Sequence, residues 1–326
     1  MTARKTASTA TPHVTRKPGG ALSPRRAHGL VGEIAKRYFG ERPRRIVRRG
    51  GGLTNLVFEF RAAGADYVVR LHADPAQLNH YLKEQWAMVE ARRVGVPTPE
   101  VLEVDNQAVE LPYMVMKRVD GVDAAHHPDR LRLVGELGRL AARLHGVRTQ
   151  GFGEVFDWSS NRLSRRSSWG SFLDEDFNVE QRIATLSRSR MLTPAQAKAL
   201  EEALVTMRRW RKPAVLHHGD LRLKNLVVAP DSGQLLALID WEECLSAPAP
   251  YWDLSIALHD LNPDAKEAFL DGYGITPRAY AQALPFMRAL NTLNYSHAVE
   301  RLRRHGEHAR LAWYRTRLQG LFDLYL

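Results

Sequence analysis

One polar stretch of the sequence, HGDLRLKNLVVAPDSGQLLALIDWEE, carries side chains suited to metal and phosphate chemistry; it runs from residue 218 to residue 243. Asp-Ser-Gly at residues 231–233 lies between two apolar runs and predicts the turn of a hairpin. Symmetrical folding about this turn brings Asn225 opposite Asp240. An amide oxygen and a carboxylate are then offered side by side, and both are hard oxygen donors of the kind that Mg²⁺ prefers.

Asp220 lies five residues before Asn225, on the loop that enters the predicted hairpin. It therefore faces the same cleft without being a metal ligand. Phosphoryl transfer needs a carboxylate that accepts the proton of a hydroxyl group, and ligands for the metal that bridges the phosphates. An isolated H-G-D is more often an ordinary hydrogen-bonded loop pair. Here H-G-D-x-x-x-x-N precedes an apolar strand that ends in Asp, and this spacing favours phosphoryl transfer.

HGDLRLKN followed by LIDWE resembles the signature of the aminoglycoside phosphotransferase and choline kinase superfamily, a relative of the protein kinases. The resemblance covers residues 46–256 through spaced motifs. It implies that His218 shapes the loop and that Asp220 is the catalytic base. It also implies that Asn225 and Asp240 bind magnesium.

Two further residues near this segment have structural interpretations. APYWDLSIA resembles the family's segment in which an aspartate opens a helix behind the catalytic loop, so Asp253 is expected to order that loop. His217 is expected to be a hydrogen-bonded structural histidine. Arg222 stands where the family usually has histidine or proline, and its charge either stabilises the transferred phosphoryl group or faces solvent.

The nucleotide side of the resemblance lies upstream, in GGGLTNLVFEF, YVVRLH and YMVMKRVDG. Glycines between strands let backbone N–H groups approach a polyanion, and the first segment resembles the family's G-G-[ST]-N phosphate loop. Arg70 stands where this fold usually has a lysine that contacts the nucleotide; Glu84 is its expected partner and Glu90 the competitor. The third segment resembles the hinge strand that pairs with adenine. The residues expected to bind ATP, with GTP not excluded, are Gly51, Gly52, Thr54, Asn55, Arg70, Glu84, Met116 and Arg118.

The arrangement of apolar periods predicts an α+β protein, and the resemblance makes it a bilobal protein-kinase-like fold. We expect a disordered basic tail over residues 1–26, which lack hydrophobic periodicity. Two strand hairpins and one helix predict a small antiparallel-sheet lobe over residues 27–118, which binds the nucleotide. Residues 119–326 are expected to form a larger, mostly helical lobe for catalysis and acceptor binding.

Composition limits the other classes of function. The net charge of +11 lies within residues 1–50, which hold 13 Lys+Arg against 2 Asp+Glu, so the remainder balances at 34 against 34. A solvated basic tail is therefore expected, with no specific nucleic-acid partner. The single cysteine, Cys244, excludes an intramolecular disulfide framework and favours a cytoplasmic protein. No apolar run reaches the length of a membrane span.

The acceptor is the least specified partner: a small molecule with a hydroxyl group, either aminoglycoside-like or another amino alcohol. LDEDF, residues 173–177, either attracts a cationic acceptor or is a solvated helix start. The balanced charge of residues 51–326 argues against a polycationic acceptor, which would favour a markedly acidic cleft. A choline or ethanolamine kinase and a catalytically silent nucleotide-binding module remain the alternatives, and the sequence does not indicate an oligomeric state.

Overall fold

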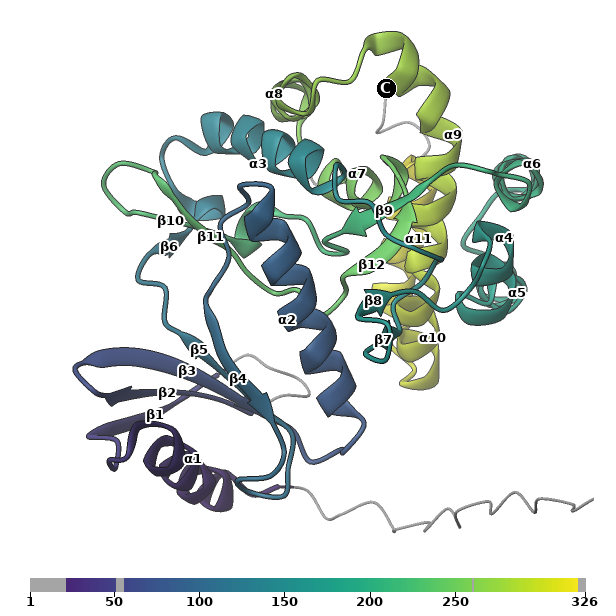
Figure 1. The fold of residues 1–326 in the computed structure, drawn as a ribbon. Coiled ribbons are helices and arrows are strands. Elements are labelled where there is room, and N and C mark those ends of the chain that lie inside the picture. Colours follow the sequence, from purple (N-terminus) through teal and green to yellow (C-terminus); the bar gives the residue numbers. More distant parts are fainter. Residues whose placement is uncertain (1–21, 51–55, 260, 322–326) are drawn as a thin grey trace, which may run out of the picture.

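The structure, a computed structural model, describes residues 22–50, 56–259 and 261–321, which form a small and a large lobe (Figure 1). In the small lobe five antiparallel strands are ordered β1-β2-β3-β5-β4. Its elements are α1 (Pro24–Phe39), β1 (Arg45–Arg49), β2 (Leu56–Ala62), β3 (Ala65–Leu71), α2 (Gln77–Arg93), β4 (Val101–Asp105) and β5 (Tyr113–Lys117).

Alternating burial along β2 and β3 forms the core of this lobe. Phe58 and Phe60 on β2, and Val69 on β3, point to the face that α1 covers, because side chains two apart in a strand share a face. The turn between these strands has positive φ at Ala63 and Gly64, 48° and 79°. The expected pair of hairpins is confirmed.

The helix α1 begins inside the stretch that was expected to be a disordered tail. Residues 24–26 form its first turn. Ser23 caps this turn by accepting a hydrogen bond from the backbone N–H of Arg26 at 3.3 Å, and a proline at the first helical position has the φ that a helix needs. Ala27 is fully buried. The rest of the predicted tail, residues 1–21, lies outside the described residues.

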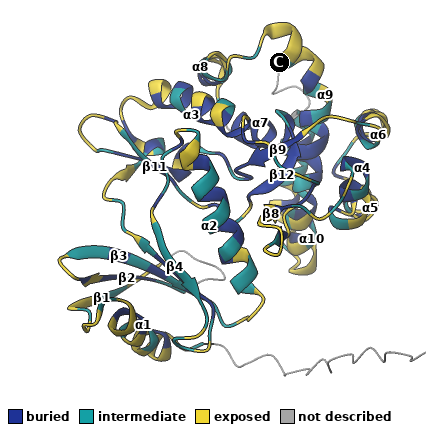
Figure 2. Cartoon of the chain, viewed as in Figure 1, coloured by how far each residue is buried: buried dark blue, intermediate teal, exposed yellow. Residues whose placement is uncertain are grey.

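The large lobe is mostly helical, as expected. Figure 2 shows its buried centre around β9, β12 and α7. Its helices are η1 (Ala124–His126), α3 (Arg130–Leu144), α4 (Trp169–Ser171), η2 (Phe172–Asp176), α5 (Val179–Arg188), α6 (Pro194–Arg208), η3 (Leu223–Asn225), α7 (Tyr251–Ala257), α8 (Pro263–Tyr273), α9 (Pro277–Asn294), α10 (Ser296–Arg304) and α11 (His308–Leu321). Its strands are β6 (Val122–Asp123), β7 (Phe156–Asp157), β8 (Arg162–Leu163), β9 (Ala214–His217), β10 (Leu226–Val228), β11 (Leu235–Leu238) and β12 (Leu245–Pro248).

The hairpin β10–β11 forms, but its predicted register is wrong by one residue. Leu226 pairs with Leu238, and the backbone N–H of Ile239 donates to the carbonyl of Asn225 at 2.8 Å. Asn225 therefore lies opposite Ile239, and Asp240 is the next residue. The cause is local: the turn closes between Ala229 and Gln234, before the predicted centre, and an irregularity in the ladder recovers only part of the shift.

Candidate active site

The loop between β9 and η3 holds Asp220 in a tightly packed backbone. Gly219 has a φ of 88°, and a Cβ at this position would lie 1.9 Å from the carbonyl oxygen of Glu243. Only glycine combines this left-handed conformation with such a close approach. The loop is thereby pressed against the segment that follows Asp240.

Asp253, at the start of α7, ties this loop down from behind. It is fully buried, and its two carboxylate oxygens accept the backbone N–H groups of His218 at 3.0 Å and Gly219 at 2.8 Å. His145 Nε2 lies 3.1 Å from the same carboxylate and His217 Nδ1 3.4 Å away. Burial favours the protonated acid, but these donors and both imidazoles prevail and hold the pKa of Asp253 well below its usual value.

His218 connects the loop to the end of β11. Its Nε2 donates to the carbonyl of Ile239 at 3.0 Å, and its Nδ1 accepts the backbone N–H of Asp220 at 3.3 Å. This requires the neutral imidazole, and burial lowers its pKa accordingly. One side chain therefore sets the position of Asp220 relative to Asp240, the residue after Ile239.

Two cations and one amide hold the carboxylate of Asp220. Arg222 Nε lies 2.8 Å from one oxygen, and Lys224 Nζ lies 2.9 Å from the other, which Asn225 Nδ2 also approaches at 3.1 Å. Partial burial acts to raise the pKa of Asp220. The charges of Arg222 and Lys224 outweigh it, so that the pKa lies below its usual value. The group is a carboxylate at neutral pH. The ion pair of Arg222 with Asp220 was not among the two interpretations of this residue; the side chain is also 40% exposed.

Asn225 and Asp240 offer oxygen atoms that no described protein group uses. Asn225 is nearly buried, and its Nδ2 donates to the carbonyl and the carboxylate of Asp220, which leaves Oδ1 without a donor among the described residues. Asp240 is exposed, has a φ of 67°, and has no hydrogen bond or ion pair within the described part of the chain. Free carboxylate and amide oxygens at neighbouring positions fit a magnesium ion.

A cleft of about 570 Å³ between the lobes contains Arg70, Glu84, Met116, Arg118 and Asp240. These are the predicted nucleotide residues that the structure describes, together with a predicted metal ligand. The other four, Gly51, Gly52, Thr54 and Asn55, lie outside the described residues.

Arg70 is paired as expected. Its Nη1 lies 2.5 Å from the carboxylate of Glu84, which is 1% exposed, and its Nη2 lies 3.4 Å from Glu242. Glu90 pairs with Arg93 instead. Burial lowers and the two carboxylates raise the pKa of Arg70, and the carboxylates prevail. The guanidinium thus links α2 to the segment after Asp240.

Lys83 was missed by the sequence analysis. Its side chain is 1% exposed, and Nζ donates to the backbone carbonyl of Glu242 at 2.6 Å. A lysine on a helix usually faces solvent, so its place beside Glu84 gave no signal of this role. It thereby holds the backbone two residues beyond Asp240. This part of α2 contacts the segment that follows Asp240 in two ways, through Lys83 and through the Arg70–Glu84 pair.

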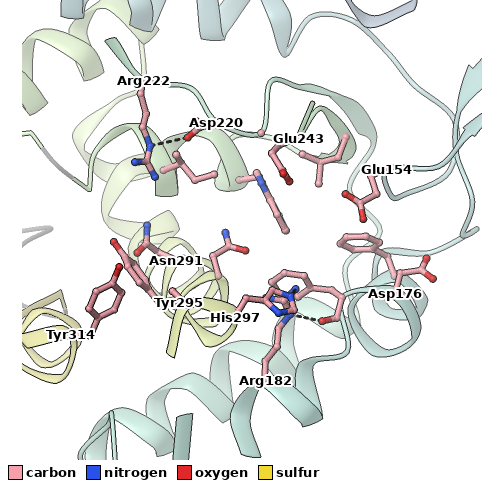
Figure 3. Close-up of a pocket in the computed structure, with 18 of the residues that line it drawn as sticks. Glu154, Asp176, Arg182, Asp220, Arg222, Glu243, Asn291, Tyr295, His297 and Tyr314 are labelled. Atoms are coloured by element: carbon pink, nitrogen blue, oxygen red, sulfur yellow. Dashed lines mark hydrogen bonds and ion pairs between the residues drawn. The ribbon is translucent and has the colours of Figure 1, made fainter. Parts of the chain in front are cut away.

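A second cavity, of about 760 Å³, is lined by Asp220 and by its neighbours in the loop between β9 and η3 (Figure 3). Glu243 borders both cavities. The side chains that line this second cavity and that the sequence did not point to include Glu154, Arg182, Asn291, Tyr295 and His297. They come from distant segments, so no local motif joins them. We call this space the acceptor cavity, after the role that we propose for it.

The acidic run at residues 173–177 does not offer free charge to this cavity. Asp174 pairs with Arg208 at 2.8 Å, and Glu175 with Arg166 at 2.5 Å. Asp176 lines the cavity but is bound by the same Arg166 through both carboxylate oxygens, at 3.0 and 2.9 Å. Each carboxylate of the run already has an arginine partner, so the run offers no unpaired acidic side chain to a cationic acceptor. The run is also not exposed throughout, since Leu173 is fully buried.

Comparison with known proteins shows the family of this chain. The sequence pattern of the phosphotransferase enzyme family matches residues 45–290. Hygromycin-B 4-O-kinase of Escherichia coli is 24% identical over 217 residues, 63% of this chain and 60% of that kinase. Acyl-CoA dehydrogenase family member 10 of Mus musculus is 22% identical over 212 residues, 61% of this chain and 19% of that protein. The chain thus spans less than two thirds of either relative.

Solved structures establish the fold. A ternary complex of a thermostable mutant of aminoglycoside phosphotransferase APH(4)-Ia with ADP and hygromycin B is similar with a TM-score of 0.67 at 19% identity, over 90% of this chain and 98% of that one. The similarity confirms the expected α+β, two-lobed kinase-like fold. In the described part of the chain, no helix is long and apolar enough to cross a membrane.

Proposed function

The chain belongs to the phosphotransferase enzyme family, and on this premise we propose that it transfers the γ-phosphoryl group of ATP, with Mg²⁺, to a hydroxyl group of a small molecule. One observation carries the proposal. Asp220 lines the acceptor cavity and Asp240 lines the cleft between the lobes, and His218 joins the loop that holds Asp220 to the end of β11, next to Asp240. Nucleotide and acceptor would thus meet at this loop. The cytoplasmic location expected from the single cysteine is part of the same proposal.

Asp220 is the proposed catalytic base. Its low pKa makes it a weak base, but phosphoryl transfer passes through a loose transition state in which the hydroxyl group needs orientation more than early deprotonation. The carboxylate would receive a hydrogen bond from the acceptor hydroxyl and take its proton as the acceptor oxygen bonds to the γ-phosphorus, while the bond from that phosphorus to the β,γ-bridging oxygen breaks and ADP leaves. Arg222 and Lys224 orient the carboxylate and add positive charge beside the transferred group.

Asn225 and Asp240 are the proposed magnesium ligands, through Oδ1 and the carboxylate that no described residue occupies. A magnesium ion bound there would neutralise part of the negative charge on the phosphates of ATP. Arg70, oriented by Glu84, and the backbone near Met116 and Arg118 form the wall of the cleft for the nucleotide. The glycine segment at residues 51–55 is proposed as its phosphate loop on the sequence resemblance alone.

The acceptor is proposed to be aminoglycoside-like or another amino alcohol, with a choline or ethanolamine type of substrate as the alternative. Two relatives support a small hydroxylated acceptor: one is named as a kinase of hygromycin B, and the other is solved with hygromycin B and ADP. A catalytically silent module is the competing class. The unoccupied oxygens of Asn225 and Asp240 beside a paired, ionised Asp220 favour an active enzyme.

The experiment is ADP formation by the purified chain with ATP, Mg²⁺ and a panel of hydroxylated acceptors, read together with nucleotide binding. We expect acceptor-dependent ADP formation and a phosphate monoester detectable by ³¹P NMR. Nucleotide binding without a phosphorylated product from any acceptor would support the silent module. ADP formation that does not depend on an acceptor would contradict transfer to a hydroxyl group other than that of water.

A further inference from the structure

Arg182 on α5 is a partly buried cation that forms no ion pair with any carboxylate in the part of the chain that the structure describes. Its guanidinium stacks on the ring of Phe177 at 3.9 Å. Its N–H groups donate to the carbonyls of Phe177 at 2.6 Å and Leu293 at 3.1 Å, to Ser296 Oγ at 3.1 Å and to His297 Nε2 at 2.7 Å. One N–H of Nη2 is left without a partner among the described residues. The hydrogen bonds fix the side chain, but none of them neutralises its charge.

The charge of Arg182 remains uncompensated by its neighbours. Burial lowers the pKa of Arg182 to about 10, against a smaller opposite effect of Glu154. His297 does not supply a negative charge, and both burial and Arg182 lower its own pKa. A guanidinium that has lost part of its hydration is stabilised by an oxyanion that binds to it. This side of the acceptor cavity therefore suits an anionic group.

The carboxylates of the acceptor cavity do not supply that anion. Asp220 is bound by two cations and Asp176 by Arg166. Glu154 and Glu243 make no ion pair within the described part of the chain; Glu154 is exposed, and burial raises the pKa of Glu243, which disfavours its charged form. The cavity thus lacks the excess of buried negative charge that a polycationic ligand requires. Arg182 is therefore a partly buried positive charge of this cavity that forms no ion pair with a described carboxylate.

Asn291 on α9 gives a second, independent sign of a ligand in the same cavity. The residue is 4% exposed, and its Nδ2 donates to the carbonyl of Ser255. Its Oδ1 is buried and receives no hydrogen bond from any residue that the structure describes. An unpaired buried carbonyl oxygen costs about 1–3 kcal/mol, which a donor group of a bound molecule recovers. Figure 3 shows Asn291 beside the cavity, with Asp220 and Arg182 on opposite walls.

We infer that the acceptor carries an oxyanion, of the carboxylate or phosphate-ester class, which binds at Arg182 while its reacting hydroxyl group lies at Asp220. A hydroxyl or amine of the same molecule donates to Asn291 Oδ1. This inference rests on the proposed phosphotransfer and narrows its acceptor. An amino alcohol that also carries an anionic group fits this cavity, because its anion can bind Arg182 and its amine can lie near the carboxyl groups of Glu154 and Glu243.

The test uses matched pairs of hydroxylated probes that differ only in the anion: glucuronate against glucuronamide, and muramic acid against its amide. ADP formation and the shift in melting temperature are measured for the full chain with ATP or ADP and Mg²⁺. A charge-assisted hydrogen bond predicts at least a ~10-fold lower KM or Kd for the anionic member of a pair. If no anionic member is preferred to its amide, or if hygromycin B is preferred to both, the inference is wrong.

Variants separate recognition from structural support. Arg182→Gln should remove the preference within each pair, whereas Arg188→Gln, which removes an exposed charge at the end of the same helix, should retain it. If Arg182→Gln does not fold, Arg182→Lys keeps the charge and should keep the preference at reduced size. An Arg182 variant that weakens both members of a pair equally would make this residue a structural support only. Binding of the anion without ADP formation would instead contradict phosphotransfer, and phosphorylation of only the neutral members would contradict the inference alone.

Discussion

Replacing Asp253 by Asn tests whether one buried carboxylate organises the catalytic loop. The change keeps the shape of the side chain but places an NH₂ group where an oxygen accepts hydrogen bonds. If the amide oxygen stays with Gly219, the NH₂ group faces the N–H of His218 and Nε2 of His145. Two charge-assisted bonds of about 1.5–3 kcal/mol each are then lost, and donors oppose donors.

The expected loss of unfolding free energy is about 3–5 kcal/mol, the range for breaking a buried charged network. For a chain of this size it lowers the melting temperature by roughly 5–8 °C. ADP formation should fall more than nucleotide binding, because His218 and Gly219 lead directly into Asp220. The assay is thermal unfolding together with turnover and nucleotide Kd, with Asp271→Asn on α8, a carboxylate without such a network, as the control. Wild-type stability and turnover in Asp253→Asn would refute the reasoning.

Three further predictions concern the backbone, the histidines and α2. Gly219→Ala should abolish turnover, because its methyl group would lie 1.9 Å from the carbonyl oxygen of Glu243. Gly64→Ala is the control: its φ is 79° and no atom lies within 4 Å of the added methyl group, so it should cost only about 1 kcal/mol of stability. Equal effects of the two variants on denaturant unfolding and on turnover would contradict the packing argument. Stability should fall by about 2 kcal/mol between pH 8 and pH 5, because burial lowers the pKa of His145 to about 4 and only the unfolded chain takes up a proton below about pH 6.5. His145→Gln should flatten that dependence, and an unchanged slope in denaturant titrations would exclude His145 as its source. Lys83→Met should raise the Mg²⁺ concentration for half-maximal ADP formation about 10-fold, whereas Lys198→Met, at an exposed lysine on α6 away from both cavities, should leave it unchanged.

The catalytic segment was readable from the sequence because its residues are close along the chain. H-G-D, Asn and the strand-ending Asp are joined by a short hairpin, so turn chemistry and strand period suffice to bring them together. The register was missed by one residue. A ladder irregularity near Val228 depends on how the turn packs, and hydrophobic patterns do not show it. The pairing of Arg70 with Glu84 was predicted from the family resemblance, and the structure shows it.

The acceptor cavity could not be read in the same way. Arg182 and Asn291 are brought together by the packing of α5 and α9, more than a hundred residues apart. Their polar atoms resemble ordinary helix residues in the sequence. The same holds for the acidic run at residues 173–177, whose charge is taken up by Arg166 and Arg208 from other segments. Long-range ion pairs of this kind decide whether a charged run is free to bind a ligand, and no local pattern specifies them.

The central claim is that Asp220 acts on the acceptor hydroxyl and not on the nucleotide. The direct measurement is ADP formation and nucleotide Kd for Asp220→Asn with an acceptor that the wild-type chain phosphorylates, beside Asp231→Asn, the same chemical change in the exposed turn of the hairpin. We predict a turnover at least ~100-fold lower in Asp220→Asn, with nucleotide Kd unchanged and Asp231→Asn like wild type. Turnover near the wild-type rate in Asp220→Asn would contradict the account.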